Sequence, residues 1–275
     1  MLGAGAAAAA YARWIEPRWI RIIRRDLPVA GLLPAWDGVR LALIADMHHG
    51  PWVPLEYLAG AMRQVGSLSP DLVVVAGDFI YGTSPVHCDS VAGLFRDLAP
   101  PLGVLACLGN HDYGVARPRP DRPALPPLRI GEVLPQNGVR VLRNEAIRLT
   151  RDGQDLWIAG VEDCWNGPFQ PVAAMAGIPA DAAVLTLCHN PDAAEYLDAL
   201  HPSTILSGHT HGGQVQIPLW GPPLVPVVHR DRYEGLHRVG RSWLYVNRGL
   251  GWLYQVRFNC RPEITVLTLR PAAVR

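Results

Sequence analysis

Short apolar runs separate polar stretches in the first third of the chain. Val39–Ala45 and Leu72–Ala76 are two such runs, and each is followed closely by an aspartate. Between them, apolar residues recur three or four positions apart, at Leu55, Leu58, Met62 and Val65. Runs of this length are typical of buried strands, and the intervening spacing is that of one helix face. The pattern predicts a strand–helix–strand unit with parallel strands.

The same alternation continues toward the C-terminus. Apolar positions from Val91 to Leu98 predict a second helix, and Val104–Leu108 predicts a third strand. Arg117–Pro127 is dense in proline and predicts a surface loop. Further strands are expected at Arg140–Leu142, Ile147–Thr150, Leu156–Val161, Ala183–Leu187, Thr204–Leu206, Trp243–Val246 and Ile264–Leu269, and helices at Val172–Gly177 and Pro191–Leu200. We expect these later strands to form a second, more antiparallel sheet that the last two close, which makes the fold class α/β and α+β-like.

The N-terminal 36 residues differ from the rest. Residues 1–12 are uncharged but fall short of the roughly 20 residues that span a bilayer. No basic residue precedes the alanines, so a secretory signal is not expected, although the run fits the tail of a longer anchor. Trp and Ile then alternate with five arginines from Arg13 to Arg25. Such a segment suits a membrane surface, and it equally suits an edge strand or a lead-in packed on the domain. We therefore divide the chain into an extension over 1–36, which includes this candidate membrane-contacting segment, and one domain over 37–275.

Charge and cysteine content exclude several classes of protein. The formal net charge is only +1, which provides no long-range field to attract a polyanion, so a dedicated nucleic-acid binder is not expected. Five scattered cysteines, none in a C-x-x-C pair, indicate neither a disulfide framework nor a thiolate zinc site. A hydrophobic content of 49% is enough for a large core and excludes a disordered chain.

Polar residues of the types that bind metal ions follow five of the expected strands. They are Asp46 and His48, Asp78, Asn110 and His111, His189, and His209 and His211. Open α/β sheets place ligand sites at the carboxyl ends of their strands, so we expect these side chains to meet at one edge. Carboxylate, imidazole and amide oxygen suit hard or borderline divalent ions, whereas the absence of Cys disfavours a closed structural zinc site. The pattern indicates a catalytic metal.

These motifs closely resemble the signatures of the calcineurin-like metallophosphoesterase superfamily. They appear in order as Asp46-Met47-His48-His49-Gly50, Gly77-Asp78, Gly109-Asn110-His111-Asp112, His189 and Gly208-His209-Thr210-His211. The resemblance implies a two-sheet β-sandwich core flanked by helices, with two divalent ions (Mn, Fe or Zn) bridged by Asp78. It assigns Asp46, His48 and His211 to one ion, and Asn110, His189 and His209 to the other.

The resemblance also implies a reaction. Two adjacent cations can bind a phosphate and share an activated hydroxide that attacks phosphorus. His111 would act on the leaving oxygen as general acid or transition-state stabiliser, and Asp112 would hold its ring in the required tautomer. The resemblance thus predicts a phosphoric ester hydrolase, most similar to phosphodiesterases.

Further motifs resemble the bacterial membrane-associated branch of the superfamily. They are Ile15–Trp19, Gly208–Gln214, Gly249–Gly251 and Asn259–Ile264. The branch contains phosphodiesterases and UDP-2,3-diacylglucosamine pyrophosphatases, which implies a phosphate-ester substrate linked to a lipid. We expect a cytoplasmic protein or one bound peripherally to the inner membrane. No protein partner can be inferred.

Three alternatives and several residues stay open. A nuclease or a phosphomonoesterase of the same superfamily, or a metal-free binding protein on this fold, would fit parts of the pattern. The apolar loop Ile217–Val228 either meets an acyl chain or a bilayer, or packs on the domain's own flank. His49 either supports the metal ligands or is structural, and His229 either touches substrate or lies on the surface. His87, His201 and His237 are expected to be ordinary surface or loop histidines.

Overall fold

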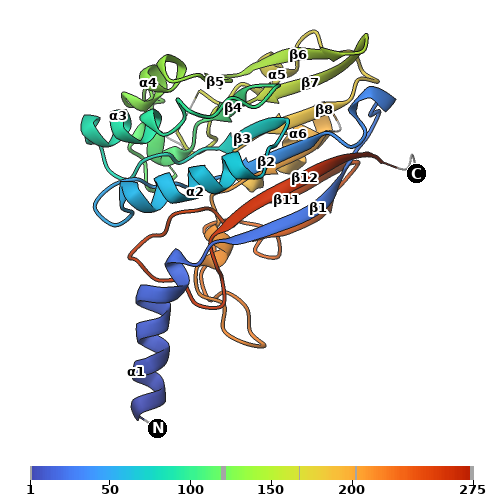
Figure 1. Ribbon diagram of the computed structural model, residues 1–275. Coiled ribbons are helices and arrows are strands. Elements are labelled where there is room, and N and C mark those ends of the chain that lie inside the picture. Colours follow the sequence, from blue (N-terminus) through green and yellow to red (C-terminus); the bar gives the residue numbers. More distant parts are fainter. Residues whose placement is uncertain (1, 119–121, 167, 202, 273–275) are drawn as a thin grey trace.

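Two six-stranded sheets form the centre of the computed structural model, which describes residues 2–118, 122–166, 168–201 and 203–272. The strand order is β1-β12-β2-β3-β4-β5 in the first sheet and β10-β11-β9-β8-β7-β6 in the second (Figure 1). The strands are β1 (Arg21–Val29), β2 (Arg40–Ile44), β3 (Leu72–Ala76), β4 (Val104–Cys107), β5 (Val139–Val141), β6 (Glu145–Arg151), β7 (Gln154–Gly160), β8 (Val184–Leu187), β9 (Thr204–Ser207), β10 (Gly235–Val239), β11 (Ser242–Val246) and β12 (Glu263–Pro271).

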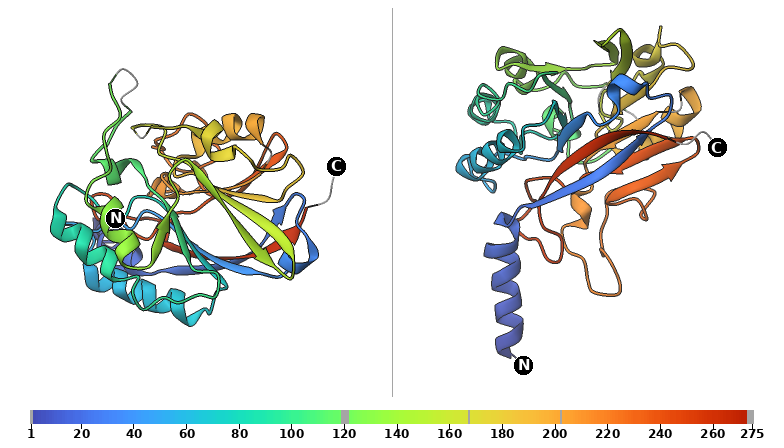
Figure 2. Two further views of the ribbon diagram at one scale, coloured as in Figure 1. Left: turned by 90° about the horizontal axis from the view of Figure 1, so that it is seen from above. Right: turned by 45° about the vertical axis from the view of Figure 1, so that its right-hand side comes forward.

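Helices cover the outer faces of both sheets. Helices α2, α3 and α4 lie on the first sheet, and α5 and α6 lie on the second (Figures 1 and 2). Their bounds are α2 (Leu55–Ser67), α3 (Pro85–Gly93), α4 (Ile130–Gln136), α5 (Pro171–Met175) and α6 (Ala194–Leu200), and α1 (Leu2–Ala10) begins the described chain. Single turns of 3-10 helix lie at Glu16–Arg18, Pro34–Trp36, Asn110–Tyr113, Pro191–Ala193 and His211–Gly213, and a π-helical turn at Tyr11–Ile15. The layers are therefore helix, sheet, sheet, helix.

Strand β2 shows why its run is almost uniformly apolar. Successive side chains of a strand point to opposite faces of the sheet. Ala42 and Ile44 pack beneath α2, whereas Leu41 and Leu43 belong to the core between the two sheets. In a strand that is buried on both faces, apolar residues occupy every position and do not alternate with polar ones. This explains why the apolar runs predicted the central strands well.

Parallel pairing brings the strand ends to one edge. Strands β2, β3 and β4 run parallel to one another, and β8 and β9 run parallel in the second sheet. The two antiparallel pairs of the second sheet, β6 with β7 and β10 with β11, lie at its edges. The polar motifs after these five strands consequently lie in loops at the same end of the sandwich.

Two strands belong to a different sheet from the one expected. Ile264–Leu269 falls in β12, which lies in the first sheet between β1 and β2. Arg140–Leu142 overlaps β5, which pairs parallel with β4 and not with the later strands. Apolar periodicity identifies a strand but carries no information on its partner, because both sheets share one apolar interior. The sheet assignments of these two strands were therefore wrong.

The helix boundaries also differ slightly. The expected helix over Val91–Leu98 is α3, which begins earlier and ends at Gly93. The expected helix Pro191–Leu200 begins as a 3-10 turn before α6. Residues 117, 118 and 122–127 contain no helix or strand, in agreement with the expected loop, of which residues 119–121 lie outside the described part.

The N-terminal segment contributes an edge strand. Strand β1 pairs parallel with β12 from Arg21 opposite Glu263 to Val29 opposite Pro271. The segment assigned to the extension thus supplies part of the first sheet. Helix α1 projects away from the two sheets (Figures 1 and 2). Among the described residues, no helix has both the length and the apolar character needed to cross a bilayer.

Candidate metal centre

The seven residues expected to bind metal lie together at the edge where the strands end. Asp46 and His48 follow β2, Asp78 follows β3, and Asn110 follows β4. The second sheet supplies His189 after β8, and His209 and His211 after β9. All seven side chains are buried. Parallel strands from both sheets therefore deliver one concentrated set of candidate ligands.

These residues form two groups that meet at Asp78. In the first group, His211 Nε2 lies 3.5 Å from Asp46 Oδ1 and 3.0 Å from His48 Nε2. In the second, His189 Nε2 lies 3.1 Å from Asp78 Oδ2 and 3.2 Å from His209 Nδ1. His48 Nε2 also lies 3.4 Å from Asp78 Oδ2, so the Asp78 carboxylate reaches both groups. Each group has ligand atoms within 4.8 Å of one another, close enough to hold one ion.

Hydrogen bonds fix which nitrogen of two histidines faces the centre. His189 Nδ1 donates to the carbonyl of Ala76 at 2.7 Å, which leaves Nε2 facing Asp78. His209 Nε2 bonds to the carbonyl of Pro226 at 3.3 Å, which leaves Nδ1 facing His189. Metal-binding histidines are commonly oriented by such a bond from the opposite ring nitrogen.

Asn110 offers an oxygen that lacks a protein partner. Its Nδ2 donates to the carbonyl of Val115 at 2.5 Å, which orients the amide. Its Oδ1 is buried and accepts no hydrogen bond within the described chain. A buried acceptor with no partner costs free energy unless a cation or donor meets it. The donor set, which combines this oxygen with two aspartates and four histidines, fits two divalent ions.

The backbone at the centre is strained. Five of the seven candidate ligands, Asp46, His48, Asp78, His209 and His211, have positive φ values between 47° and 71°. This left-handed region costs a residue other than glycine of the order of 1 kcal/mol or more. Strain of this kind is retained where function requires a particular side-chain direction. Its concentration at the candidate ligands is independent support for the site.

Glycines in the motifs allow the close approach of backbone and ligand. A β-carbon at Gly109 would overlap Asp78 Oδ1, and one at Gly208 would lie 2.5 Å from Asp46 Oδ2. Neither position could carry a side chain without moving an aspartate. The two motifs therefore require glycine for a steric reason.

Burial and neighbouring charge shift the ionisation of the cluster. Burial lowers the pKa of His48 and of His209 to about 3, so both imidazoles are neutral at pH 7 and able to bind metal. Burial opposes ionisation of Asp78, but His189 and His111 outweigh it and hold the Asp78 pKa well below its usual value. Burial also opposes protonation of His189, yet Asp78 raises its pKa to about 10. Without added cations, a charged His189 thus neutralises Asp78.

His111 lies at the mouth of the centre and is half-buried. Its backbone N–H donates to Asp78 Oδ1 at 2.9 Å, and its ring lies edge-on to His48 with centroids 4.7 Å apart. Tyr81 stacks on the His111 ring with centroids 5.4 Å apart, and its own ring lies 6.2 Å from that of His48. A ring nitrogen of His111 lies within 4.8 Å of ligand atoms of His48 and Asp78, so the imidazole directly borders the candidate ligands.

Asp112 occupies a different place from the one expected. Its carboxylate accepts the backbone N–H groups of Gly109, Asp78 and Phe79, each at 2.9 Å. The side chain therefore ties the loop after β3 to the loop after β4 and faces backbone, not the His111 ring. The expectation that Asp112 orients His111 was wrong, because a carboxylate inside a tight turn is satisfied by nearby backbone donors.

The remaining histidines have local partners. His49 Nδ1 bonds to the carbonyl of Val53 and Nε2 to Ser90 Oγ, each at 3.0 Å, which fits a structural residue. His229 lies 3.1 Å from Glu195 on a partly exposed surface. His237 bonds to the carbonyl of Glu234 at 2.8 Å, and His201 to that of Pro179 at 3.1 Å. His87 packs edge-on against His49 at 4.9 Å.

Sequence reasoning missed three residues near the centre. Tyr81 borders His111, and the Trp165 ring lies edge-on to His209 at 4.4 Å. Asp163 is buried, and its burial raises its pKa to about 6. Asp163 and Trp165 follow β7 just as the recognised motifs follow their strands. The two adjacent acidic residues after that strand, Glu162 and Asp163, were the signal that could have identified this part of the site.

Arg257 was missed for a different reason. It is fully buried, and its guanidinium donates to the carbonyls of Arg248, Gly249, Gly251 and His211. An arginine within an irregular loop gives no periodic signal from which such burial could be read. Its contacts fix the 248–251 loop beside Asp46.

Comparisons with known proteins agree with this geometry. Residues 39–213 match the family model described as calcineurin-like phosphoesterase. Phosphodiesterase YaeI of Escherichia coli (strain K12) is 33% identical over 260 residues, covering 94% of this chain and 92% of the relative. The uncharacterized metallophosphoesterase YkuE of Bacillus subtilis (strain 168) is 32% identical, covering 98% and 93%. UDP-2,3-diacylglucosamine pyrophosphatase LpxG of Chlamydia muridarum (strain MoPn / Nigg) is 28% identical, covering 94% and 91%. This chain belongs to the calcineurin-like phosphoesterase family.

Proposed function

We propose that the chain is a dinuclear metal-dependent phosphodiesterase or pyrophosphatase. The observation that carries this proposal is the position of the Asp78 carboxylate between two groups of buried ligand atoms. Asp46, His48 and His211 would hold one ion with Asp78, and Asn110, His189 and His209 would hold the other. Two bound divalent ions supply Lewis-acid polarisation of a phosphate and a more acidic water. Mn, Fe and Zn all suit these nitrogen and oxygen ligands.

The protein's own groups would then complete the site. His111 reaches the mouth of the centre, where its imidazole can donate a proton to the leaving oxygen of the ester. The bond from its backbone N–H to Asp78 keeps it close to the phosphate position. Tyr81 stacks on the ring and supports it. His111 is therefore the proposed catalytic acid, and Asp112 has a structural role in the loop.

The test combines metal content with hydrolysis. Wild-type protein should bind two Mn²⁺ per chain and hydrolyse bis-p-nitrophenyl phosphate faster than p-nitrophenyl phosphate. Loss of an outer contact to a metal ligand commonly costs 10–100-fold, so Asp78→Asn should cost more than about a hundredfold. Asp89→Asn, an exposed carboxylate paired with Arg129, serves as the control. Full activity of Asp78→Asn, or a wild-type protein with neither metal nor activity, would overturn the proposal.

We further propose that the substrate carries an apolar chain, as in a lipid-linked nucleotide such as UDP-2,3-diacylglucosamine. A cavity of about 570 Å³ adjoins His209 and His211. Most of its remaining lining is apolar, including Leu224, Val225 and Leu253. Such a surface beside a phosphate-binding centre suits an acyl group. The name of the LpxG relative is consistent with this substrate class.

Two serine substitutions distinguish the contribution of the cavity to turnover from that of the surrounding loop. Leu224 lines the cavity, whereas Trp220 is exposed on the same loop and does not line it. Leu224→Ser should lower turnover of a nucleotide-linked diacylglucosamine about tenfold or more while sparing the soluble diester, because burial of a leucine contributes roughly 1.5–3 kcal/mol. Trp220→Ser is the matched control when the lipid-linked substrate is presented in detergent. Equal effects of Leu224→Ser on both substrates would exclude an acyl site.

We also propose peripheral contact with a membrane. Trp14, Ile15 and Trp19 are exposed in the N-terminal segment, and Leu219 and Trp220 are exposed on the 217–228 loop. Helix α1 and this loop project from the same end of the molecule in Figure 1 and in the right-hand view of Figure 2. Exposed tryptophan close to arginine is typical of residues at a bilayer interface. Co-sedimentation with lipid vesicles tests this contact, and its absence with every vesicle composition would exclude it.

A further inference from the structure

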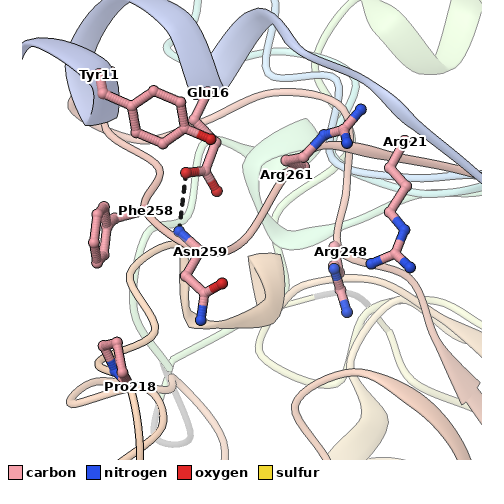
Figure 3. A pocket seen from close by; sticks show the side chains of 8 residues that line it. All are labelled: Tyr11, Glu16, Arg21, Pro218, Arg248, Phe258, Asn259 and Arg261. Atoms are coloured by element: carbon pink, nitrogen blue, oxygen red, sulfur yellow. Dashed lines mark hydrogen bonds between the residues drawn. The ribbon is translucent and has the colours of Figure 1, made fainter. Parts of the chain in front are cut away.

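A second polar cavity lies outside the metal centre, beside the N-terminal segment. Its volume is about 490 Å³, and its lining is Tyr11, Glu16, Arg21, Pro218, Arg248, Phe258, Asn259 and Arg261. In Figure 3 the three arginines lie on one side of this cavity, and Tyr11, Phe258 and Pro218 lie on the other. We call it the arginine cavity. One wall is cationic and the opposite wall is mainly apolar.

Two of its charged residues already have partners. Glu16 is buried, and its carboxylate accepts the backbone N–H groups of Asn259 at 2.9 Å and Cys260 at 2.5 Å (Figure 3). Arg248 Nε lies 2.8 Å from Glu234 Oε2, so this guanidinium is paired with a carboxylate. Arg248 therefore supplies no unbalanced charge to the cavity, whereas the backbone amides orient the Glu16 carboxylate without neutralising it.

The other two arginines keep their charge uncompensated. Arg261 donates to the backbone carbonyls of Trp19 at 2.8 Å and Ile20 at 2.9 Å, and its guanidinium lies 3.9 Å from the centroid of the Trp19 ring. Carbonyls and an aromatic face orient the group without neutralising it. Arg21 is exposed, and the described chain places no carboxylate within ion-pair distance of either side chain. The cavity therefore presents two available cations, one of them held rigidly.

The surroundings indicate what kind of anion would meet these cations. The exposed Trp19 ring packs on the Arg261 guanidinium of the cavity, and the exposed Leu219 and Trp220 directly follow Pro218 of its lining. A soluble anion has no need of apolar residues on both sides of its site. A phospholipid requires this arrangement, because its phosphate lies at the level of arginine while its chains lie beside tryptophan.

We propose that the arginine cavity binds the phosphate group of an anionic phospholipid at a bilayer surface, through Arg21 and Arg261. The proposal rests on the proposed membrane contact and is independent of the metal centre. It assigns the positive wall to the phosphate and the wall of Tyr11, Phe258 and Pro218 to the glycerol and upper chain region. Bound in this way, the 217–228 loop beside the apolar cavity would face the bilayer.

The test measures partitioning of the full chain between buffer and vesicles. Wild-type protein should bind vesicles of phosphatidylcholine with phosphatidylglycerol more tightly than vesicles of phosphatidylcholine alone. A basic residue near an anionic surface contributes about fivefold, so Arg21→Gln should weaken binding to anionic vesicles by about that factor, and Arg21→Gln with Arg261→Gln by more. Arg151→Gln is the control, because it removes the same charge from an exposed position on β6, an edge strand of the second sheet that does not line the cavity. All variants should hydrolyse bis-p-nitrophenyl phosphate at the wild-type rate.

Each other outcome would overturn the proposal in a recognisable way. Equal weakening by Arg151→Gln and Arg21→Gln would mean that net charge alone is sensed. Binding of inorganic phosphate or glycerol 3-phosphate to the arginine cavity in solution, with no preference for anionic vesicles, would assign it to a soluble anion. Arg21→Gln makes this test independent of folding, because the Arg21 side chain has no hydrogen bond to lose within the described chain. Absence of vesicle binding by the wild-type protein, with intact hydrolysis, would overturn this proposal and leave the proposed enzymatic activity standing.

Discussion

The carboxylate of Asp112 bonds to three backbone amides in two different loops, which gives a single residue control over the positions of Asp78 and Asn110. In Asp112→Asn, one acceptor oxygen becomes an NH₂ group that faces a backbone N–H. A buried donor left without a partner costs about 1–3 kcal/mol, so the free energy of unfolding should fall by that amount. Urea denaturation measures this change. Asp97→Asn, at an exposed position, should change stability little, and equal stability of Asp112→Asn and wild type would contradict the role described.

His111 is expected to affect the chemical step but not metal binding. A positioned general acid contributes typically 10²–10⁴-fold, so His111→Ala should lower kcat by about that factor for a diester with an alkyl leaving group. The loss should be smaller for a p-nitrophenyl ester, because p-nitrophenolate leaves without needing a proton. Metal content should equal that of the wild type. An equal loss for both leaving groups would exclude His111 as the acid.

At the scale of elements, the loop after β4 can hold Asp78 only because Gly109 lacks a side chain. Gly109→Ala would press a β-carbon against Asp78 Oδ1 and displace the carboxylate. Clashes of this kind cost typically 1–3 kcal/mol, and we expect loss of both stability and Mn²⁺ affinity. Gly93→Ala is the control, because a β-carbon at this helical position meets nothing within 4 Å. Calorimetric titration with Mn²⁺ would contradict this account if both variants bound like wild type.

The motifs could be predicted from the sequence because each follows a buried, parallel strand whose apolar run is unmistakable. The sheet that a strand joins could not be predicted, as β5 and β12 show, because the runs of both sheets point into the same interior. Strand β1 was ambiguous because its arginines lie at an exposed edge, where no apolar alternation is required. The role of Asp112 depends on how two loops cross, and spacing along the chain does not contain that information.

At the scale of the whole molecule, bound metal should stabilise the fold. Seven buried candidate ligands from both sheets meet at one centre, so cations held there link the two sheets. Ligand at 100 times its dissociation constant contributes about 2.7 kcal/mol. For a chain of this size, removal of metal by EDTA should lower Tm by about 5–10 °C, and Mn²⁺ should restore it. Thermal unfolding of Asp78→Asn should show a much smaller response, and equal responses would contradict a shared carboxylate.

The central claim is that two cations lie side by side and share Asp78. Anomalous diffraction from crystals grown with Mn²⁺ tests it most directly, because the signal locates each ion. We predict two peaks roughly 3.5–4 Å apart, with the Asp78 carboxylate between them, Asp46, His48 and His211 around one peak, and Asn110, His189 and His209 around the other. A single peak, or two peaks that do not share Asp78, would contradict the account.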